Sequence, residues 1–197
     1  MDSISYIRHH MKNTIETKQR MLNDEALLQR LADAAALCVD ALREGKKVMF
    51  AGNGGSAADS QHLAAEFVSR FNFDRPGLPS IALTTDTSML TAIGNDYGFE
   101  NLFSRQVQAN GQFGDVFVGI STSGNSVNII KAVEQAKAMG IHTIAFCGDG
   151  GKLPHMCDIT LGAPSDLTPY IQETHISFGH ILCGIVEEEL FASYKPD

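Results

Sequence analysis

The sequence predicts an α/β protein, a three-layer αβα sandwich built on a five-stranded parallel sheet with a helical extension at its N-terminus. Short apolar, β-prone runs alternate along the chain with longer segments of helical periodicity. Apolar strands of this kind are typical of a parallel sheet covered by helices on both faces. The first 45 residues carry apolar groups at helical spacing without a glycine-rich break, which indicates helices ahead of the first strand.

Two helices are expected at the N-terminus, over residues 3–21 and 26–43, with a break near Asn23-Asp24. Their apolar residues exceed what one face of a sheet requires. We therefore expect residues 1–45 to contribute to oligomerisation. The chain of 197 residues suits one sizeable core, so residues 1–197 are expected to form a single domain.

Strands and helices then alternate. Strands are expected at residues 47–51, 80–84, 115–121, 142–147 and 158–161. Helices are expected at 57–70, 87–94, 101–109 and 126–139, with Gly140 as a stop signal, and a last one from about Pro169 or Tyr170 to Tyr194. Five such strands suit the doubly wound, flavodoxin-like order 2-1-3-4-5, whose crevice opens at the carboxyl ends of the first and third strands.

Composition excludes several classes of function. A formal charge of −8 and a pI near 5.3 argue against a nucleic-acid or membrane binder. No apolar run approaches the roughly 20 residues that cross a bilayer, and the N-terminus is too polar for a signal peptide, so we expect a cytoplasmic protein. The four cysteines form no CxxC pair, which indicates reduced structural thiols.

Two serine-bearing loops are candidates for binding a phosphate. Gly52-Asn53-Gly54-Gly55-Ser56 leaves the first expected strand, and Ser121-Thr122-Ser123-Gly124-Asn125-Ser126 leaves the third. Glycines let backbone N–H groups approach an anion, and each loop opens a helix whose positive end favours a dianion. We assign to phosphate the hydroxyls of Ser56, Ser121, Ser123 and Ser126, with Thr122 as a further candidate.

The first loop allows other interpretations. Ser56 and Ser126 could simply cap helices. The run from Gly52 to Ala57 also fits the loose dinucleotide pattern GxGxxA, with Asp86 as a ribose-binding acid. A dinucleotide site leaves the second serine loop unexplained.

Polar residues follow at helical spacing. His62 and Glu66 lie four residues apart, hence on one helix face, where they could form a metal site, an acid–base pair or merely a solvated pair. Gln172 and His180 on the last helix differ by about 80° in azimuth and about 12 Å along the axis. If both bind one metal, the helix must start irregularly near Gln172, or one of them must come from a neighbouring subunit. His175 is expected to be structural or at an interface.

The run from Phe50 to Glu66 (FAGNGGSAADSQHLAAE), the loop from Ser121 to Ser126 and Gln172-Glu173-Thr174-His175 resemble the phosphoheptose isomerase family of sugar-isomerase (SIS) domains, over nearly the whole chain. The resemblance implies interconversion of sedoheptulose 7-phosphate and D-glycero-D-manno-heptose 7-phosphate, the first step toward the heptose of lipopolysaccharide core. It also implies a homotetramer with active sites between subunits and one zinc ion per subunit. The implied zinc ligands are His62, Glu66, Gln172 and His180. The implied substrate-binding positions are Asn53, Gly54, Gly55, Glu66, Asn95, Asp96, Ser121, Thr122, Ser123, Ser126 and Gln172.

The chemistry of an aldose–ketose isomerase fits these residues. Proton transfer between C1 and C2 needs a base and an acid, roles for which Glu66 and His180 are the candidates. Asn95 and Asp96 are expected in a loop over residues 94–98, where they would bind sugar hydroxyls, although an Asn-Asp turn is the alternative. Relatives often carry an arginine shortly before the Gln172 motif, whereas this chain has Pro169-Tyr170. A rival hypothesis is a non-catalytic SIS-domain adaptor that binds the replication initiator, but such a cousin lacks the full acid–base and metal set.

Overall fold

The computed structural model describes residues 2–195 and contains one five-stranded parallel sheet. Its strand order, β2-β1-β3-β4-β5, is the predicted doubly wound order. All four strand pairings are parallel. The strands are β1 (Val48–Gly52), β2 (Ser80–Ala82), β3 (Val116–Ser121), β4 (His142–Gly148) and β5 (Ile159–Ala163).

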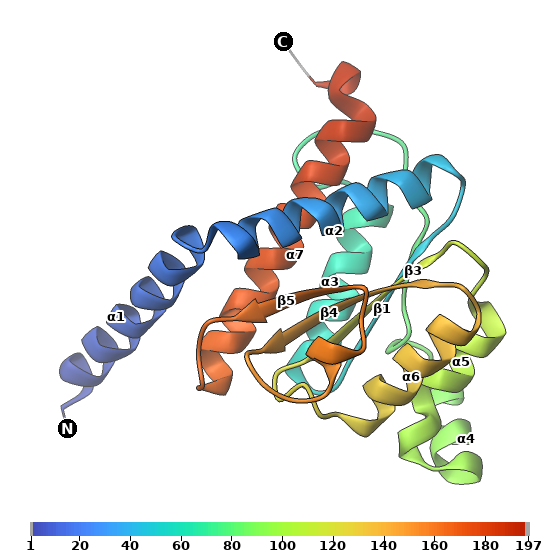
Figure 1. The fold of residues 1–197 in the computed structure, drawn as a ribbon, viewed down its shortest axis with the longest axis horizontal. Helices are drawn as coiled ribbons and strands as arrows, with labels where there is room; N and C mark the ends of the chain where they lie inside the picture. The colour runs from blue at the N-terminus through green and yellow to red at the C-terminus, as the bar shows by residue number, and fades with distance from the viewer. Residues whose placement is uncertain (1, 196–197) are drawn as a thin grey trace.

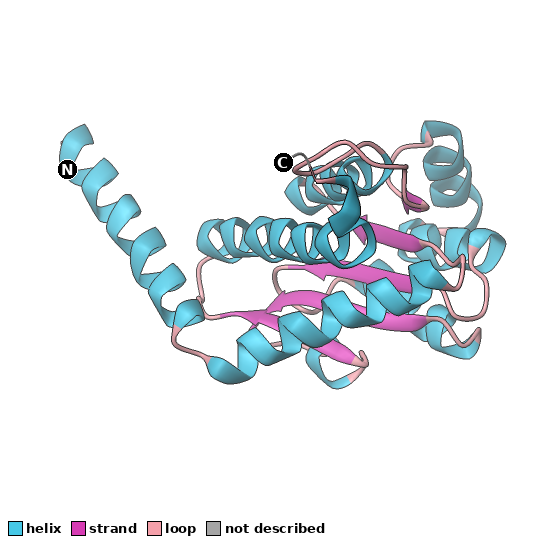
Figure 2. Cartoon of the chain, turned by 90° about the horizontal axis from the view of Figure 1, so that it is seen from above, coloured by secondary structure: helices cyan, strands magenta, loops and turns pink. Residues whose placement is uncertain are grey.

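Helices cover both faces of the sheet and complete the expected three layers (Figures 1 and 2). α2 (Glu25–Arg43), α3 (Gly55–Val68) and α7 (Thr168–Phe191) pack on one face, and α5 (Leu102–Asn110) and α6 (Val127–Ala138) on the other. Strand alternation divides the core between them, because Phe50 belongs to the first cluster while its neighbour Met49 belongs to the second. Both side chains are fully buried.

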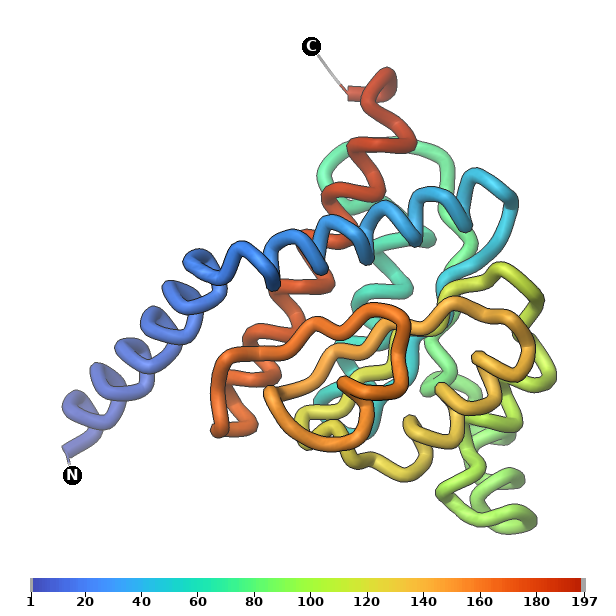
Figure 3. The backbone as a smooth tube through the Cα atoms, viewed as in Figure 1, coloured from blue at the N-terminus to red at the C-terminus, as the bar shows by residue number. Residues whose placement is uncertain are grey.

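α1 (Ser3–Leu22) projects beyond the sheet, with the N-terminus at its far end (Figures 1 and 3), and its second half contacts the start of α7, where Lys18 Nζ donates to Glu173 O at 2.8 Å. Asp2 caps it by accepting the N–H groups of Ile4 and Ser5. The predicted break near Asn23 is confirmed, since Asp24 caps α2 by accepting Leu27 N at 2.9 Å. Large apolar side chains remain exposed along α1: Ile4, Tyr6, Ile7, Met11, Ile15 and Leu22.

One structural expectation was wrong. α4 (Thr87–Tyr97) continues through Asn95 and Asp96, which lie in its last turn rather than in a loop. A glycine inside a helix costs only about 1 kcal/mol, so Gly94 does not end α4. The helix ends instead at Gly98, whose φ of 86° is the conformation that glycine adopts without strain.

Other element bounds shift by a few residues. β2 stops at Ala82 and α3 at Val68, both short of the predicted ends. α7 begins at Thr168 with Pro169 in its first turn, where the missing N–H costs nothing. Short 3-10 turns are also present within the described residues: η1 (Phe99–Asn101), η2 (Leu153–His155) and η3 (Ala192–Tyr194). Among residues 2–195, no helix is long and apolar enough to cross a membrane.

Candidate functional site

The two serine loops lie side by side at the carboxyl edge of the sheet. β1 and β3 are neighbours, and Gly52 at the end of β1 pairs with Ile120 of β3. The side chains of Asn53 and Asn128 then join the loops by exchanging two amide hydrogen bonds, at 2.9 and 2.8 Å. Both loops therefore lie at the switch point of the strand order, where a ligand crevice is expected in such sheets.

The first loop turns tightly into α3. Gly54 has a φ of 56° and occupies the N-cap position, with Gly55 as the first helical residue. A Cβ on Gly52 would lie 2.5 Å from the Ser56 carbonyl oxygen, so only glycine allows this close approach. Ser56 follows the cap instead of forming it, which contradicts the interpretation that it merely caps the helix. A hollow of about 150 Å³, lined in part by Asn53 and Gly54, opens beside the loop.

In the second loop, serine hydroxyls face one another. Ser121 Oγ and Ser126 Oγ are 2.8 Å apart, and Ser126 N donates to Ser121 Oγ at 3.4 Å. Ser126 stands at the N-cap position of α6, yet its side chain makes no capping hydrogen bond. The exposed Ser123 accepts Asn125 N at 3.2 Å. The hydroxyls of Ser121 and Ser126 are thus turned into the loop rather than toward the first turn of the helix.

Residues 148–153 support the second loop from behind. Lys152 N and Leu153 N both donate to Gly124 O, at 3.0 and 3.1 Å, and Gly148 N donates to Thr122 O at 3.1 Å. Gly124 has a φ of 65°, and a Cβ there would lie 2.3 Å from the Gly150 carbonyl oxygen. The loop therefore has a fixed shape before any ligand arrives.

Beyond the loops, α3 and α7 run in parallel and bring together the predicted catalytic residues. His62 Nε2 lies 2.9 Å from His180 Nε2 and 3.4 Å from Glu66 Oε1. The helices come this close because Gly179 has no side chain: a Cβ would lie 2.3 Å from Leu63 Cδ2. His62 and Glu66 are therefore not an isolated solvated pair, since a third polar group from α7 joins them.

Gln172 lies two turns before His180 and contacts the start of α3. α7 is regular from Thr168 onward, so of the two ways for Gln172 and His180 to share one metal, an irregular start of the helix is excluded and a neighbouring subunit remains. The Gln172 amide packs over Gly55, and it lies close enough to Asp59 to act on the pKa of that carboxyl. Within one chain, Gln172 thus reaches the end of the site near the phosphate loops rather than the histidine pair.

Sequence reasoning missed Asp59, which links these groups. Burial raises the pKa of Asp59, while the Gln172 amide and the nearby His62 and His180 act in the opposite direction. Asp59 Oδ2 is buried without a hydrogen-bond partner among the described residues. Its spacing was a usable signal, because positions 59, 62 and 66 share one face of a helix.

The side chains of His62, Glu66 and His180 carry donor atoms of the types that bind metals, but they do not form a complete coordination site. Among residues 2–195, no three His, Cys, Asp or Glu side chains form a complete metal-binding group. Two imidazole nitrogens and one carboxylate are nevertheless donors that zinc accepts. Adjacent ligands of a tetrahedral zinc ion lie roughly 3.3 Å apart, and His62 is 2.9 Å from His180 and 3.4 Å from Glu66. His62 thus lies at the spacing of zinc ligands from both His180 and Glu66, whereas Gln172 of the same chain packs over Gly55 instead.

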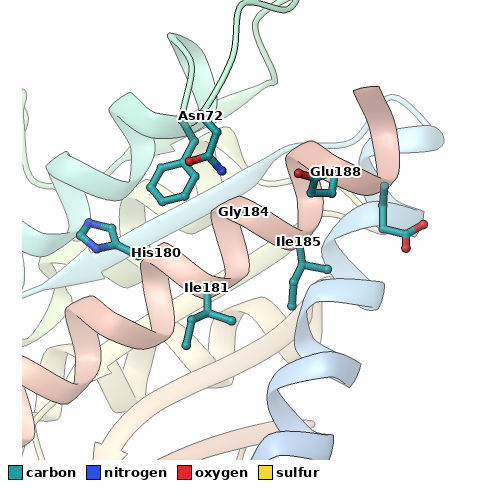
Figure 4. A pocket seen from close by; sticks show the side chains of 8 residues that line it. Asn72, His180, Ile181, Gly184, Ile185 and Glu188 are labelled. Atoms are coloured by element: carbon teal, nitrogen blue, oxygen red, sulfur yellow. The ribbon is translucent and has the colours of Figure 1, made fainter. Parts of the chain in front are cut away.

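His180 also borders a groove of about 580 Å³ along α7 (Figure 4). Ile181, Gly184 and Ile185 line the groove from the helix, and Asn72 faces it from the segment after α3. The Phe71 ring lies 5.6 Å from the His180 ring, centroid to centroid. The side of the histidine pair formed by His180 therefore opens to the surface of the isolated chain.

The other predicted positions lie elsewhere. Asn95 Nδ2 donates to Asp96 Oδ1 at 2.7 Å, and Asp96 lines a separate hollow of about 290 Å³ with Arg105. Nothing in the described part of one chain brings these two residues to the serine loops. Asp86 caps α4 by accepting Met89 N at 2.9 Å, which explains it without a ribose.

His175 is fully buried, as expected for a structural residue. Its ring lies against Phe146 and Phe178. Both of its nitrogens lack a hydrogen-bond partner among the described residues.

The doubly wound parallel sheet, with two serine-bearing loops at the carboxyl ends of its first and third strands, is the architecture of a SIS-domain protein. The SIS domain family matches residues 9–148, and the chain belongs to that family. Within it, the chain is 58% identical over 187 residues to the phosphoheptose isomerase of Aneurinibacillus thermoaerophilus, covering 94% of both proteins. It is 58% identical over 188 residues to phosphoheptose isomerase 2 of Campylobacter jejuni, covering 95% of this chain and 94% of that protein.

Solved structures agree. The phosphoheptose isomerase of Neisseria gonorrhoeae superposes with a TM-score of 0.89 at 44% identity, and that of Francisella tularensis with 0.91 at 40%. Each alignment covers 95% of this chain and 100% of the other. The family resemblance of the motifs is thereby confirmed, and these relatives lend no support to the adaptor hypothesis.

Proposed function

We propose that the protein is an aldose–ketose isomerase that converts sedoheptulose 7-phosphate to D-glycero-D-manno-heptose 7-phosphate. The observation that supports the proposal is the meeting of Glu66 and His180 at His62, on helices that follow the sheet edge where the two serine loops lie side by side. The names of the relatives support the substrate. The loops would hold the phosphate, which leaves the other end of the sugar for the acid–base cluster.

The reaction moves one proton between neighbouring carbons. Glu66 would take the proton from the carbon next to the carbonyl, and His180 would donate one to the carbonyl oxygen to form an enediol. The reverse transfers on the other carbon complete the isomerisation. His62, between the two, is placed to orient both side chains.

We further propose one zinc ion per subunit, held by His62, Glu66 and His180. Zinc would supply polarisation of the substrate oxygens. The proposed fourth ligand is Gln172 of a neighbouring copy of the chain, because α7 separates Gln172 from His180 by about 12 Å within one copy. A homotetramer with active sites between subunits meets this requirement, and the exposed apolar side chains of α1 supply a surface for it.

We propose that the enzyme is cytoplasmic and catalyses the first step in the synthesis of nucleotide-activated heptose for lipopolysaccharide core. The direct test is turnover of sedoheptulose 7-phosphate by purified protein, with and without added zinc. Formation of the aldose phosphate is expected. Absence of turnover with zinc present refutes the isomerase, and capture of the replication initiator would then favour the adaptor.

A further inference from the structure

A buried ion pair joins the carboxyl end of α3 to α7, outside the site described so far. Arg75 Nε donates to Glu187 Oε1 at 3.1 Å, and the two side chains are 2% and 1% exposed. A buried pair survives only when hydrogen bonds satisfy its remaining donors and acceptors. The partners of these two residues therefore show what the pair holds in place.

Glu187 holds the segment that follows α3. Its Oε1 accepts Phe71 N at 2.8 Å, and its Oε2 accepts Asn72 N at 2.6 Å. Burial alone would raise the pKa of Glu187, but these N–H donors and Arg75 together hold it below its usual value. Glu187 is thus a fixed anion, placed two turns beyond His180 on the same helix. The Phe71 ring that it positions lies against the His180 ring.

Arg75 holds the end of α3 itself. Its Nη2 donates to the carbonyl oxygen of Glu66 at 2.8 Å, and its Nη1 to that of Phe67 at 2.7 Å. These are carbonyls of the last helical turn, which have no partner within a helix. The same guanidinium thereby contacts the backbone of the proposed base and, through Glu187, the helix that carries the proposed acid.

We propose that Arg75 and Glu187 are positioning residues that fix His180 on α7 relative to Glu66 on α3. The proposal rests on the function proposed above. Neither side chain touches the reacting atoms, so their effect passes through backbone contacts. Because displacements near 1 Å can cost roughly 100-fold in rate, a loosened pair would lower kcat. KM would change little, since the phosphate loops lie at the opposite end of α3.

The chain offers a matched control for loss of a buried ion pair. Asp115 is 1% exposed; it accepts the backbone N–H groups of Lys47 at 3.0 Å and Gln112 at 2.8 Å, and it pairs with Lys47 Nζ. It precedes β3, at the edge of the sheet opposite the serine loops. Asp115→Asn removes a buried carboxylate with similar partners but far from His180.

The test uses a double variant that carries both Arg75→Met and Glu187→Leu. Because both charges are removed together, no unpaired charge stays buried. The control is the single variant Asp115→Asn. Folding is checked by circular dichroism and the thermal midpoint. In the double variant, kcat for sedoheptulose 7-phosphate is expected to fall at least about tenfold with KM within about twofold. The control is expected to lose thermal stability while keeping its kcat.

A second readout does not need turnover. In chelator-treated protein at one fixed pH, the side-chain NMR resonances of His62 and His180 are expected to shift in the double variant and not in the control. A folded double variant with unchanged kcat and unchanged resonances overturns the proposal. If the wild-type protein shows no turnover, the proposed function is refuted. The positioning role is then tested by the NMR comparison alone. If the double variant does not fold, Arg75→Lys, which keeps the charge, takes its place in both measurements.

Discussion

Gly55 is the position where one added methyl group tests the geometry of the site most sharply. A Cβ on Gly55 would lie 1.9 Å from Gln172 Nε2, 2.7 Å from its Cδ and 2.9 Å from its Oε1. Ordinary contacts between such atoms are near 3.5 Å. In Gly55→Ala, the Gln172 amide must therefore retreat by roughly 1.5 Å and change its position relative to Asp59.

The effect on stability is expected to be small. Gly55 lies in a helix and has no positive φ, so alanine can adopt its backbone conformation. Replacing glycine in a helix stabilises by about 0.4–1 kcal/mol, which offsets the movement of a flexible, half-buried glutamine. Urea unfolding is expected to give a free energy within about 1 kcal/mol of wild type.

Catalysis is expected to suffer much more. A misplacement of about 1 Å can cost roughly 100-fold, so kcat should fall about 10- to 100-fold. Steady-state kinetics with sedoheptulose 7-phosphate measures this. A double-mutant cycle with Gln172→Ala supplies the control, because Gly55→Ala should have little further effect once the amide is gone. Full, additive losses in the double variant would refute the reasoning.

Three further predictions concern single side chains. Glu66→Gln should abolish isomerisation while calorimetry still detects substrate binding, because the serine loops are intact; unchanged turnover would exclude Glu66 as the base. His180→Asn should lose turnover and bound zinc together, and full zinc occupancy by elemental analysis would contradict its role as a ligand. Burial lowers the pKa of His175 to about 4, opposed in part by the Cys147 backbone. Below pH 6.5, His175 therefore binds a proton in the unfolded chain but stays neutral in the folded chain. The free energy of unfolding then falls by up to about 3 kcal/mol as the pH approaches 4. His175→Leu should flatten this part of the stability curve in urea titrations, and an unchanged slope would contradict the assignment.

The sequence predicted the architecture because its signals are local. The alternation of apolar runs and helical periodicity predicted five strands, and five strands alternating with helices suit the doubly wound order that the structure has. The same order predicted that the loops after Gly52 and Ser121 meet. Asn95 and Asp96 were misplaced because a glycine was taken as a helix end, whereas the required positive φ falls four residues later, at Gly98.

Contacts between residues far apart in the sequence could not be predicted from local sequence patterns. Arg75 and Glu187 are 112 positions apart, and nothing local marks either of them as the partner of the other. His62 and His180 are separated by 118 positions, and they meet only because α3 and α7 run in parallel. Asp59 could have been found by its helical spacing from His62, but its contact with Gln172 could not.

The absence of cationic residues from the two serine loops affects how a substrate is captured. Neither Gly52–Ser56 nor Ser121–Ser126 contains a lysine or arginine, and the chain as a whole carries a formal charge of −8. If these loops hold the phosphate, as proposed, a sugar phosphate dianion is repelled by the net charge while still distant and attracted only at contact by N–H and O–H groups. Salt screens interactions beyond about 8 Å at physiological ionic strength and leaves contacts almost untouched. Added salt thus weakens the long-range repulsion more than the contacts in the site. The association rate of the substrate therefore rises with ionic strength, whereas it falls with ionic strength at a site built from basic side chains.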